Sequence, residues 1–161
     1  MLPGVTCTRL GADRCPGLLK PFVAQDGAII RLRVPGGRVR VSTLADLLAI
    51  GADHGAPLLS VTSRTNLQVR GLPDPLPEDV MVRAEATGLL PSPSHERARN
   101  ILAAPLAPDL QPLVAELDAA LCADPFLADL PGRFLFAVTD ATGAVLTEPV
   151  DAAYQALTPT S

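Results

Sequence analysis

The sequence contains no tryptophan, one tyrosine and only four phenylalanines among its 161 residues. Proteins that bind single-stranded nucleic acid stack bases on aromatic side chains, and here no aromatic residues are interleaved with the arginines. The overall charge is acidic, with 17 Asp and Glu against 13 Lys and Arg. Both features argue against a nucleic-acid-binding protein.

Cysteines are also few: Cys7, Cys15 and Cys122 form no Cys-x-x-Cys motif. Their odd number and an N-terminus without the apolar core of a secretion signal predict a cytoplasmic protein with reduced thiols. His54 and His95 are isolated in the sequence, so we expect no metal site. No apolar run reaches the ~18 residues that a membrane-spanning helix requires, so no membrane partner is expected either.

The charge that is present is unevenly distributed. Up to residue 71, nine Lys and Arg oppose four acidic residues, a net charge of +5, whereas the remainder has four basic residues against thirteen acidic ones, a net charge of −9. Such a split predicts a first half that faces an anion, or two halves that face each other.

The first half has the pattern of a small α+β sheet. Residues 28–34 are β-branched and alternate around two arginines, which predicts a strand ending in a Pro-Gly-Gly turn. The apolar spacing within 42–55 predicts a helix, and 57–62 and 66–71 predict two further strands. The order β-α-β-β fits half of a ferredoxin-like sheet.

The second half begins after a stretch rich in proline. Residues 73–79 contain three prolines and three acidic residues, so we expect a linker there. Beyond it, 108–125 has the apolar stripe of a helix, and 133–146 has the pattern of a strand, a Thr-Gly turn and a second strand. One helical turn is expected in the tail from Thr147 onward.

Polar residues occupy every second position of one stretch in the first half, namely Thr62, Arg64, Asn66, Gln68 and Arg70. On a regular strand such residues share a face. Arg31 and Arg33 have the same phase on the earlier strand, and guanidinium groups bind carboxylates bidentately. The pattern predicts a sheet face for an anion with many carboxylates. The alternative is a row of arginines that are only solvated.

Two segments carry a resemblance to a known family. RCPGLLKPFVAQDGAIIRLRVPGG (14–37) and SVTSRTNLQVRGL (60–72) resemble the nitrite/sulfite reductase ferredoxin-like half-domain superfamily, and within it the N-terminal part of the precorrin-3B synthases. Further on, RARNILAAPLAP resembles the Arg-Asn segment that opens the next domain of that superfamily, and LPGRFLFAVTD resembles its Leu-Pro-x-Lys-Phe strand. The resemblance implies a ferredoxin-like half-domain over 14–73, a linker over 74–87, and over 88–161 a partial α+β domain without the cluster-binding repeat.

The resemblance also implies a substrate. Precorrin-3B synthases oxidise precorrin-3A with molecular oxygen in aerobic cobalamin biosynthesis, using a 4Fe-4S iron–sulfur cluster and iron, and the reductase relatives use siroheme. The acetates and propionates of this tetrapyrrole would be the anion. By match to the family motifs, the positions that contact it would be Arg31, Arg33, Thr62, Arg64, Asn66, Gln68, Arg70, Arg99, Asn100 and Arg133. Arg133 stands where the family usually has lysine.

The cluster ligands are the main departure from this family. Four cysteines in a later repeat hold the cluster there, and none of the three cysteines here matches them. We therefore expect a chain that binds a tetrapyrrole but no cofactor by itself, assign no catalytic residue, and expect a complementing chain that carries the cluster. The alternatives are a non-catalytic module that binds tetrapyrroles or other anions, and a degenerate remnant without function.

Overall fold

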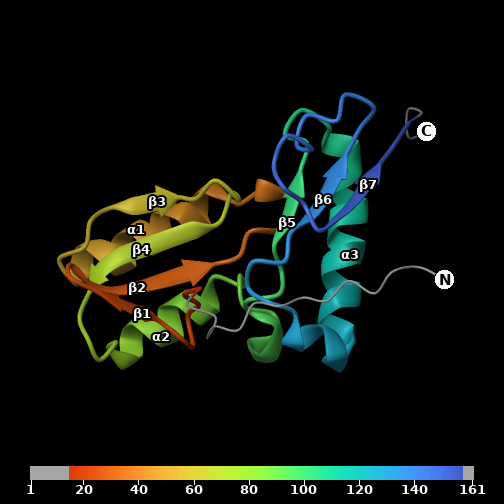
Figure 1. Ribbon diagram of the computed structural model, residues 1–161. Coiled ribbons are helices and arrows are strands. Elements are labelled where there is room, and N and C mark those ends of the chain that lie inside the picture. The colour runs from red at the N-terminus through yellow and green to blue at the C-terminus, as the bar shows by residue number, and fades with distance from the viewer. Residues whose placement is uncertain (1–14, 158–161) are drawn as a thin grey trace.

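The computed structural model describes residues 15–157 and has the expected α+β fold. Figure 1 shows two units side by side, a four-stranded sheet with two helices and a three-stranded sheet with one helix. Within the described residues, no helix has the length and apolar character needed to cross a membrane.

The first unit contains strands β1 (Phe22–Ala24), β2 (Gly27–Leu32), β3 (Leu59–Val61) and β4 (Leu67–Leu72), with helix α1 (Val41–Asp53) between β2 and β3. The strand order in the sheet is β1-β2-β4-β3, and every neighbouring pair is antiparallel. The predicted order β-α-β-β is confirmed, and β1 is an additional edge strand.

The alternation of residues along β2 and β4 separates the two faces of this sheet. Ile30 and Val69 are paired across the two strands and pack with Leu47 and Ile50 of α1 in the first hydrophobic core. Residues of the other phase, such as Arg31, therefore lie on the face opposite the helices.

Helix α2 (Glu78–Ala86) occupies most of the segment expected to be a linker, 74–87. Val80 and Ala84, one turn apart, are fully buried and belong to the same core as α1. Two buried positions one turn apart are enough to fix a short helix against a core, although prolines precede it. Residues 78–86 therefore pack with the first unit.

The second unit contains strands β5 (Ile101–Ala103), β6 (Phe136–Thr139) and β7 (Ala152–Gln155), all parallel and in that order in the sheet. Helix α3 (Gln111–Ala123) connects β5 to β6, with 3-10 helices at Pro108–Leu110 and Pro125–Asp129 on either side. Val114 and Leu121 of α3 pack against Ile101 and Val138. The helix predicted over 108–125 is confirmed.

The predicted strand-turn-strand over 133–146 is wrong in its second half. Only β6 forms, and residues 140–151 cross to the other face of the sheet, where Val145 and Val150 pack near Ala137. The next strand is β7, which lies in the tail where a helical turn was expected. Parallel strands cannot be joined by a tight turn and require such a crossover.

The two units meet at the predicted Pro-Gly-Gly turn. It forms a 3-10 helix (Pro35–Gly37) that contacts β5 and α3. Gly36 has φ +70°, and a Cβ added there would lie 3.0 Å from Cγ1 of Val114. Glycine is therefore required both by the backbone and by the close approach of α3.

Candidate functional site

Arg31 and Gln68 are cross-strand neighbours on the sheet face opposite the helices, as the alternation predicts. With the Gln68 amide oriented so that its oxygen faces Arg31, Oε1 accepts hydrogen bonds from Nε at 2.9 Å and from Nη2 at 2.6 Å. Gln68 is 9% exposed and Arg31 is half-buried. The amide therefore orients the guanidinium on this face.

Thr62 and Arg64 do not lie on that face. The stretch is not one strand, because β3 ends at Val61 and residues 62–66 form the turn into β4. Thr65 has φ +57°, and Thr62 and Asn66 close the turn through the bond from Thr62 N to Asn66 O, 2.9 Å. The predicted common face thus holds for Gln68 but not for the residues of the turn.

Asn66 and Asn100 form a buried pair between the two units, with exposures of 2% and 1%. Nδ2 of Asn66 donates to Oδ1 of Asn100 at 3.0 Å, and Oδ1 of Asn66 accepts from the backbone N–H of Val34 at 3.1 Å. Nδ2 of Asn100 donates to the carbonyls of Arg97 and Gly132, at 3.1 and 2.9 Å. Both residues, expected as substrate contacts, thus have partners inside the protein.

Arg64 and Arg133 come from different units and meet at this junction. Nη1 of Arg64 donates to the backbone carbonyl of Arg133 at 2.6 Å. Arg64 is half-buried and Arg133 is exposed, and neither forms an ion pair with any carboxylate of residues 15–157. The Arg64 guanidinium therefore lies beside the backbone of a second arginine, and two cationic residues at one junction without an acidic partner among the described residues create a positive potential that attracts anions.

The remaining predicted contacts lie elsewhere. Arg70 is exposed and pairs with Asp26, its Nη2 3.2 Å from Oδ2 of Asp26. Arg99 is 4% exposed and its Nη2 lies 2.7 Å from Oδ2 of Asp118 on α3. Arg33 is 1% exposed, so its side chain faces protein and not solvent. The structure thus forms two separate groups, Arg31 with Gln68 on the sheet face and Asn66, Asn100, Arg64 and Arg133 at the junction, while Arg70 and Arg99 are engaged by carboxylates.

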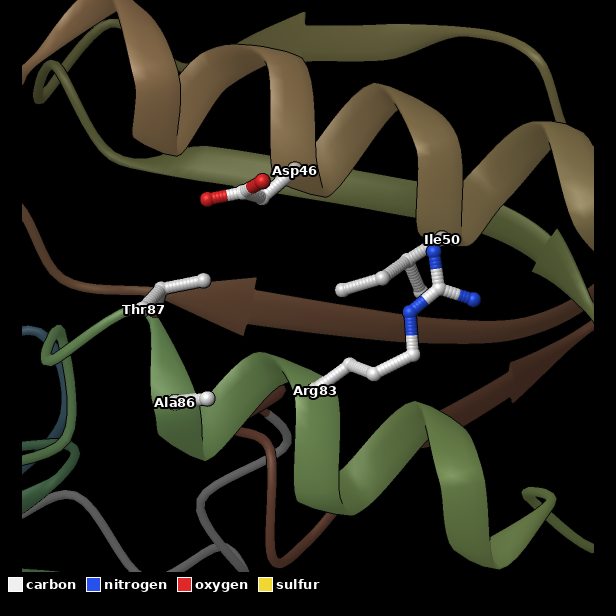
Figure 2. A pocket seen from close by; sticks show the side chains of 5 residues that line it. All are labelled: Asp46, Ile50, Arg83, Ala86 and Thr87. Carbon is white, nitrogen blue, oxygen red and sulfur yellow. The ribbon is translucent and has the colours of Figure 1, made fainter.

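A pocket lies on the other side of the first sheet. Its volume is about 220 Å³, and Figure 2 shows Asp46 and Ile50 of α1 facing Arg83, Ala86 and Thr87. Arg83 is already paired with Asp53, its Nη1 2.9 Å from Oδ2. None of the predicted contacts lines this pocket, so the anion-binding pattern and the pocket are separate features.

The thiols that the structure describes do not form a ligand set. Cys15 is buried and Cys122, on α3, is half-buried, while Cys7 lies outside the described residues. Burial raises the pKa of the Cys122 thiol, and the nearby Arg99 guanidinium partly opposes this. Among residues 15–157, no group of three or more His, Cys, Asp or Glu could hold a metal ion. These residues therefore do not fit an iron–sulfur cluster.

Glu96 is a buried charged residue that the sequence patterns did not single out. Its Oε2 accepts from the backbone N–H groups of Leu18 and Leu19, at 2.8 and 3.1 Å. A Cβ on Gly17 would overlap the Glu96 carboxylate, so the Cys-Pro-Gly segment needs glycine at this position. The signal in the sequence was the segment RCPG itself, but its acidic partner is about 80 residues away along the chain.

Comparison with known proteins bears on the first unit. A search of curated proteins finds no significant match to the chain. A family model described as the nitrite/sulfite reductase ferredoxin-like half domain matches residues 23–86, which are 64 of the 161 residues. The match includes β2, α1, β3, β4 and α2, and thus ends where α2 ends. Residues 23–86 are therefore similar to a nitrite/sulfite reductase ferredoxin-like half domain, the family that the sequence motifs suggested.

Proposed function

We propose that this chain supplies the tetrapyrrole-binding part of a precorrin-3B synthase-like oxidoreductase. In this proposal Arg64 and Arg133 bind carboxylates of an acidic tetrapyrrole such as precorrin-3A, with Arg31 as a further contact on the sheet face. The family match over residues 23–86 supports the reductase type of domain, and the motifs over 14–37 and 60–72 favour the precorrin-3B synthases within it.

One observation carries the binding site: the Arg64 side chain reaches the backbone carbonyl of Arg133 across two units, and neither arginine has an acidic partner among the described residues. Arginines elsewhere in the structure, such as Arg70, Arg83 and Arg99, are paired with carboxylates. An unneutralised pair is suited to two carboxylates of one ligand, because each guanidinium can present two N–H groups to a carboxylate.

The chain's own residues would bind and orient the macrocycle. When bound, an iron–sulfur cluster would supply the electron transfer of this family, but the described residues do not fit one. We propose that its ligands come from a complementing chain or from residues outside the described ones, and that residues 15–157 are not active alone. The protein would act in the cytoplasm, where the pathway's intermediates are soluble anions.

An anaerobic absorbance titration of the purified protein with sirohydrochlorin tests the binding step. We expect a saturable spectral shift in the parent protein. Arg64→Ala and Arg133→Ala should each weaken binding about tenfold or more, since each removes a charge-assisted hydrogen bond of roughly 1.5–3 kcal/mol.

Arg83→Ala is the matched control, because it removes one positive charge on the helix side of the sheet. Its affinity should equal that of the parent protein. Equal affinity in all four proteins would rule out the proposed site. A non-catalytic binding module would give the same titration, but no turnover of precorrin-3A after addition of any cluster-bearing partner.

A further inference from the structure

The buried amides of Asn66 and Asn100 belong to a ring of contacts that also includes the two arginines. Asn66 closes the turn that carries Arg64, and its Nδ2 donates to Oδ1 of Asn100 at 3.0 Å. Nδ2 of Asn100 donates to the carbonyl of Gly132 at 2.9 Å, and Gly132 directly precedes Arg133. The bond from Arg64 Nη1 to the carbonyl of Arg133 completes the ring.

We infer that the Asn66–Asn100 pair positions Arg64 against Arg133 and does not itself contact the ligand. The inference rests on the proposed function, since it concerns the same anion site. It assigns these two amides, which lie among positions that the family motifs associate with substrate, a role in holding the Arg64 guanidinium at the backbone of Arg133.

Burial supports a positioning role. The two side chains are 2% and 1% exposed, and besides their mutual bond they are hydrogen-bonded to the backbone of Val34, Arg97 and Gly132. Breaking one bond would leave a buried polar atom unpaired, so the arrangement resists rotation of either amide. A ligand carboxylate that bound either amide would displace one of these bonds and leave its former partner unpaired inside the protein.

The pair also joins segments that otherwise belong to separate units. Oδ1 of Asn66 accepts from the N–H of Val34, at 3.1 Å, just after β2, and Asn100, which precedes β5, donates to the loop before β6. The turn that carries Arg64 and the loop that carries Arg133 come from different units, so keeping the Arg64 side chain at the Arg133 carbonyl requires a rigid support. The amide pair and the packed Gly36 supply this support at the junction.

The consequence is selectivity for ligands with neighbouring carboxylates. Uroporphyrin carries an acetate beside a propionate on its pyrrole rings, whereas coproporphyrin has a methyl group in place of each acetate. With Arg64 held at the backbone of Arg133, we expect the first to be favoured, because the Arg64 and Arg133 side chains start from one place and can each take one of two neighbouring carboxylates. When the Asn66–Asn100 bond is broken, Arg64 is no longer held at Arg133, each arginine binds separately, and the preference for uroporphyrin over coproporphyrin falls.

The test is a double-mutant cycle with Asn66→Ala, Asn100→Ala and the double variant, titrated with uroporphyrin and coproporphyrin by fluorescence. Each single variant should bind uroporphyrin about tenfold more weakly, with a smaller change for coproporphyrin. The double variant should be no weaker than either single variant, because one broken link already opens the ring. Losses that multiply in the double variant would mean two independent ligand contacts and would overturn the inference, as would unchanged affinities.

Val80→Ala controls for loss of stability, since Val80 is fully buried among the helices and far from the ring along the chain. Its affinities should match those of the parent protein. If Asn100→Ala does not fold, Asn100→Ser is a smaller change at the same position.

Amide hydrogen exchange separates this inference from the proposed function, because it needs no ligand. Exchange within residues 62–66 and 132–133 should be faster in both asparagine variants and unchanged in Val80→Ala. If the parent protein binds neither porphyrin but exchange changes in this way, the proposed function fails and the positioning role stands. Unchanged exchange in the asparagine variants overturns the positioning role.

Discussion

Asp118 on α3 holds the Arg99 guanidinium with both carboxylate oxygens, at 2.7 Å from Nε to Oδ1 and 2.7 Å from Nη2 to Oδ2. Nη1 of Arg99 donates to the carbonyl of Leu89 at 2.8 Å. All three guanidinium nitrogens of Arg99 thus donate hydrogen bonds, and the side chain links α3 to the segment after α2. Arg99, which the family motifs predict to contact the anion, therefore forms buried contacts that connect the two units.

This arrangement predicts a large loss of stability in Asp118→Ala. The substitution leaves the Arg99 charge buried without a counter-ion, and such a break costs about 3–5 kcal/mol. Urea unfolding monitored by circular dichroism measures the free energy of unfolding. Asp109→Ala is the control, because Asp109 is exposed in the 3-10 helix that precedes α3 and should change that free energy by less than about 0.5 kcal/mol. A variant Asp118→Ala as stable as the parent, with tighter anion binding, would show that Arg99 is available to the ligand.

The contact between Gly17 and Glu96 predicts a strong interaction between two substitutions. Gly17→Ala should destabilise the protein by about 1–3 kcal/mol, because its Cβ would overlap the Glu96 carboxylate. Glu96→Ala should also be destabilising, because the N–H of Leu18 then loses its buried acceptor.

In the double variant the two losses should not add, because the methyl group introduced by Gly17→Ala occupies space that the carboxylate has left. Thermal unfolding of the parent, the two single variants and the double variant gives the coupling free energy. Strictly additive losses would mean that the two positions do not interact.

Thr139, the last residue of the central strand β6, offers a stabilising substitution in the second sheet. Its side chain is 0% exposed, and its hydroxyl has no hydrogen-bond partner within the part of the chain that the structure describes. Thr139→Val keeps the shape and removes the unpaired hydroxyl, so we expect the free energy of unfolding to rise by about 1 kcal/mol. Differential scanning calorimetry should show a higher Tm.

Thr142→Val is the matched control for that prediction. Thr142 is exposed in the turn after β6, and its backbone N–H and hydroxyl both donate to Asp140. Replacing it should lower the Tm slightly or leave it unchanged. A lower Tm for Thr139→Val would show that the hydroxyl has a stabilising partner.

The local sequence pattern was enough to predict most of the strands and the first helix of the first unit. The alternation around Arg31 placed β2 and its two faces, and the apolar spacing placed α1, because each depends on residues close in sequence. The same alternation was misleading at Arg64. Thr65 adopts a positive φ, which a threonine rarely does, and nothing in the letters SVTSRTNLQ marks the turn.

Non-local pairing explains the remaining differences. β7 pairs with β6 in parallel, so its position depends on a crossover and not on a turn signal. The Asn66–Asn100 pair spans 34 residues and the Glu96 contact with Leu18 spans 78, and no periodicity connects residues so far apart. The resemblance to a family indicated that Asn66 and Asn100 matter, but it did not indicate that they bond to each other.

The contact between His54 and Asp79, where α1 meets α2, predicts that the protein loses stability at acidic pH. The hydrogen bond from His54, 2.9 Å from Nε2 to Oδ2, lowers the pKa of Asp79 below its ordinary value of 3.8, with burial acting in the opposite direction and Arg83 adding a further lowering. Because the folded-state pKa lies below the unfolded one, the contribution is fully present above the unfolded pKa. It is lost as the pH falls through the folded value.

We therefore expect Asp79→Asn to lower the Tm at neutral pH, and the difference from the parent protein to shrink below about pH 4. Thermal unfolding followed by circular dichroism between pH 7 and pH 2 measures this difference. Asp74→Asn is the control, because Asp74 is exposed and forms no ion pair within the described residues, so its Tm should track that of the parent throughout. A difference between Asp79→Asn and the parent that stays constant down to the lowest pH would mean that the Asp79 carboxylate does not stabilise the fold through its charge.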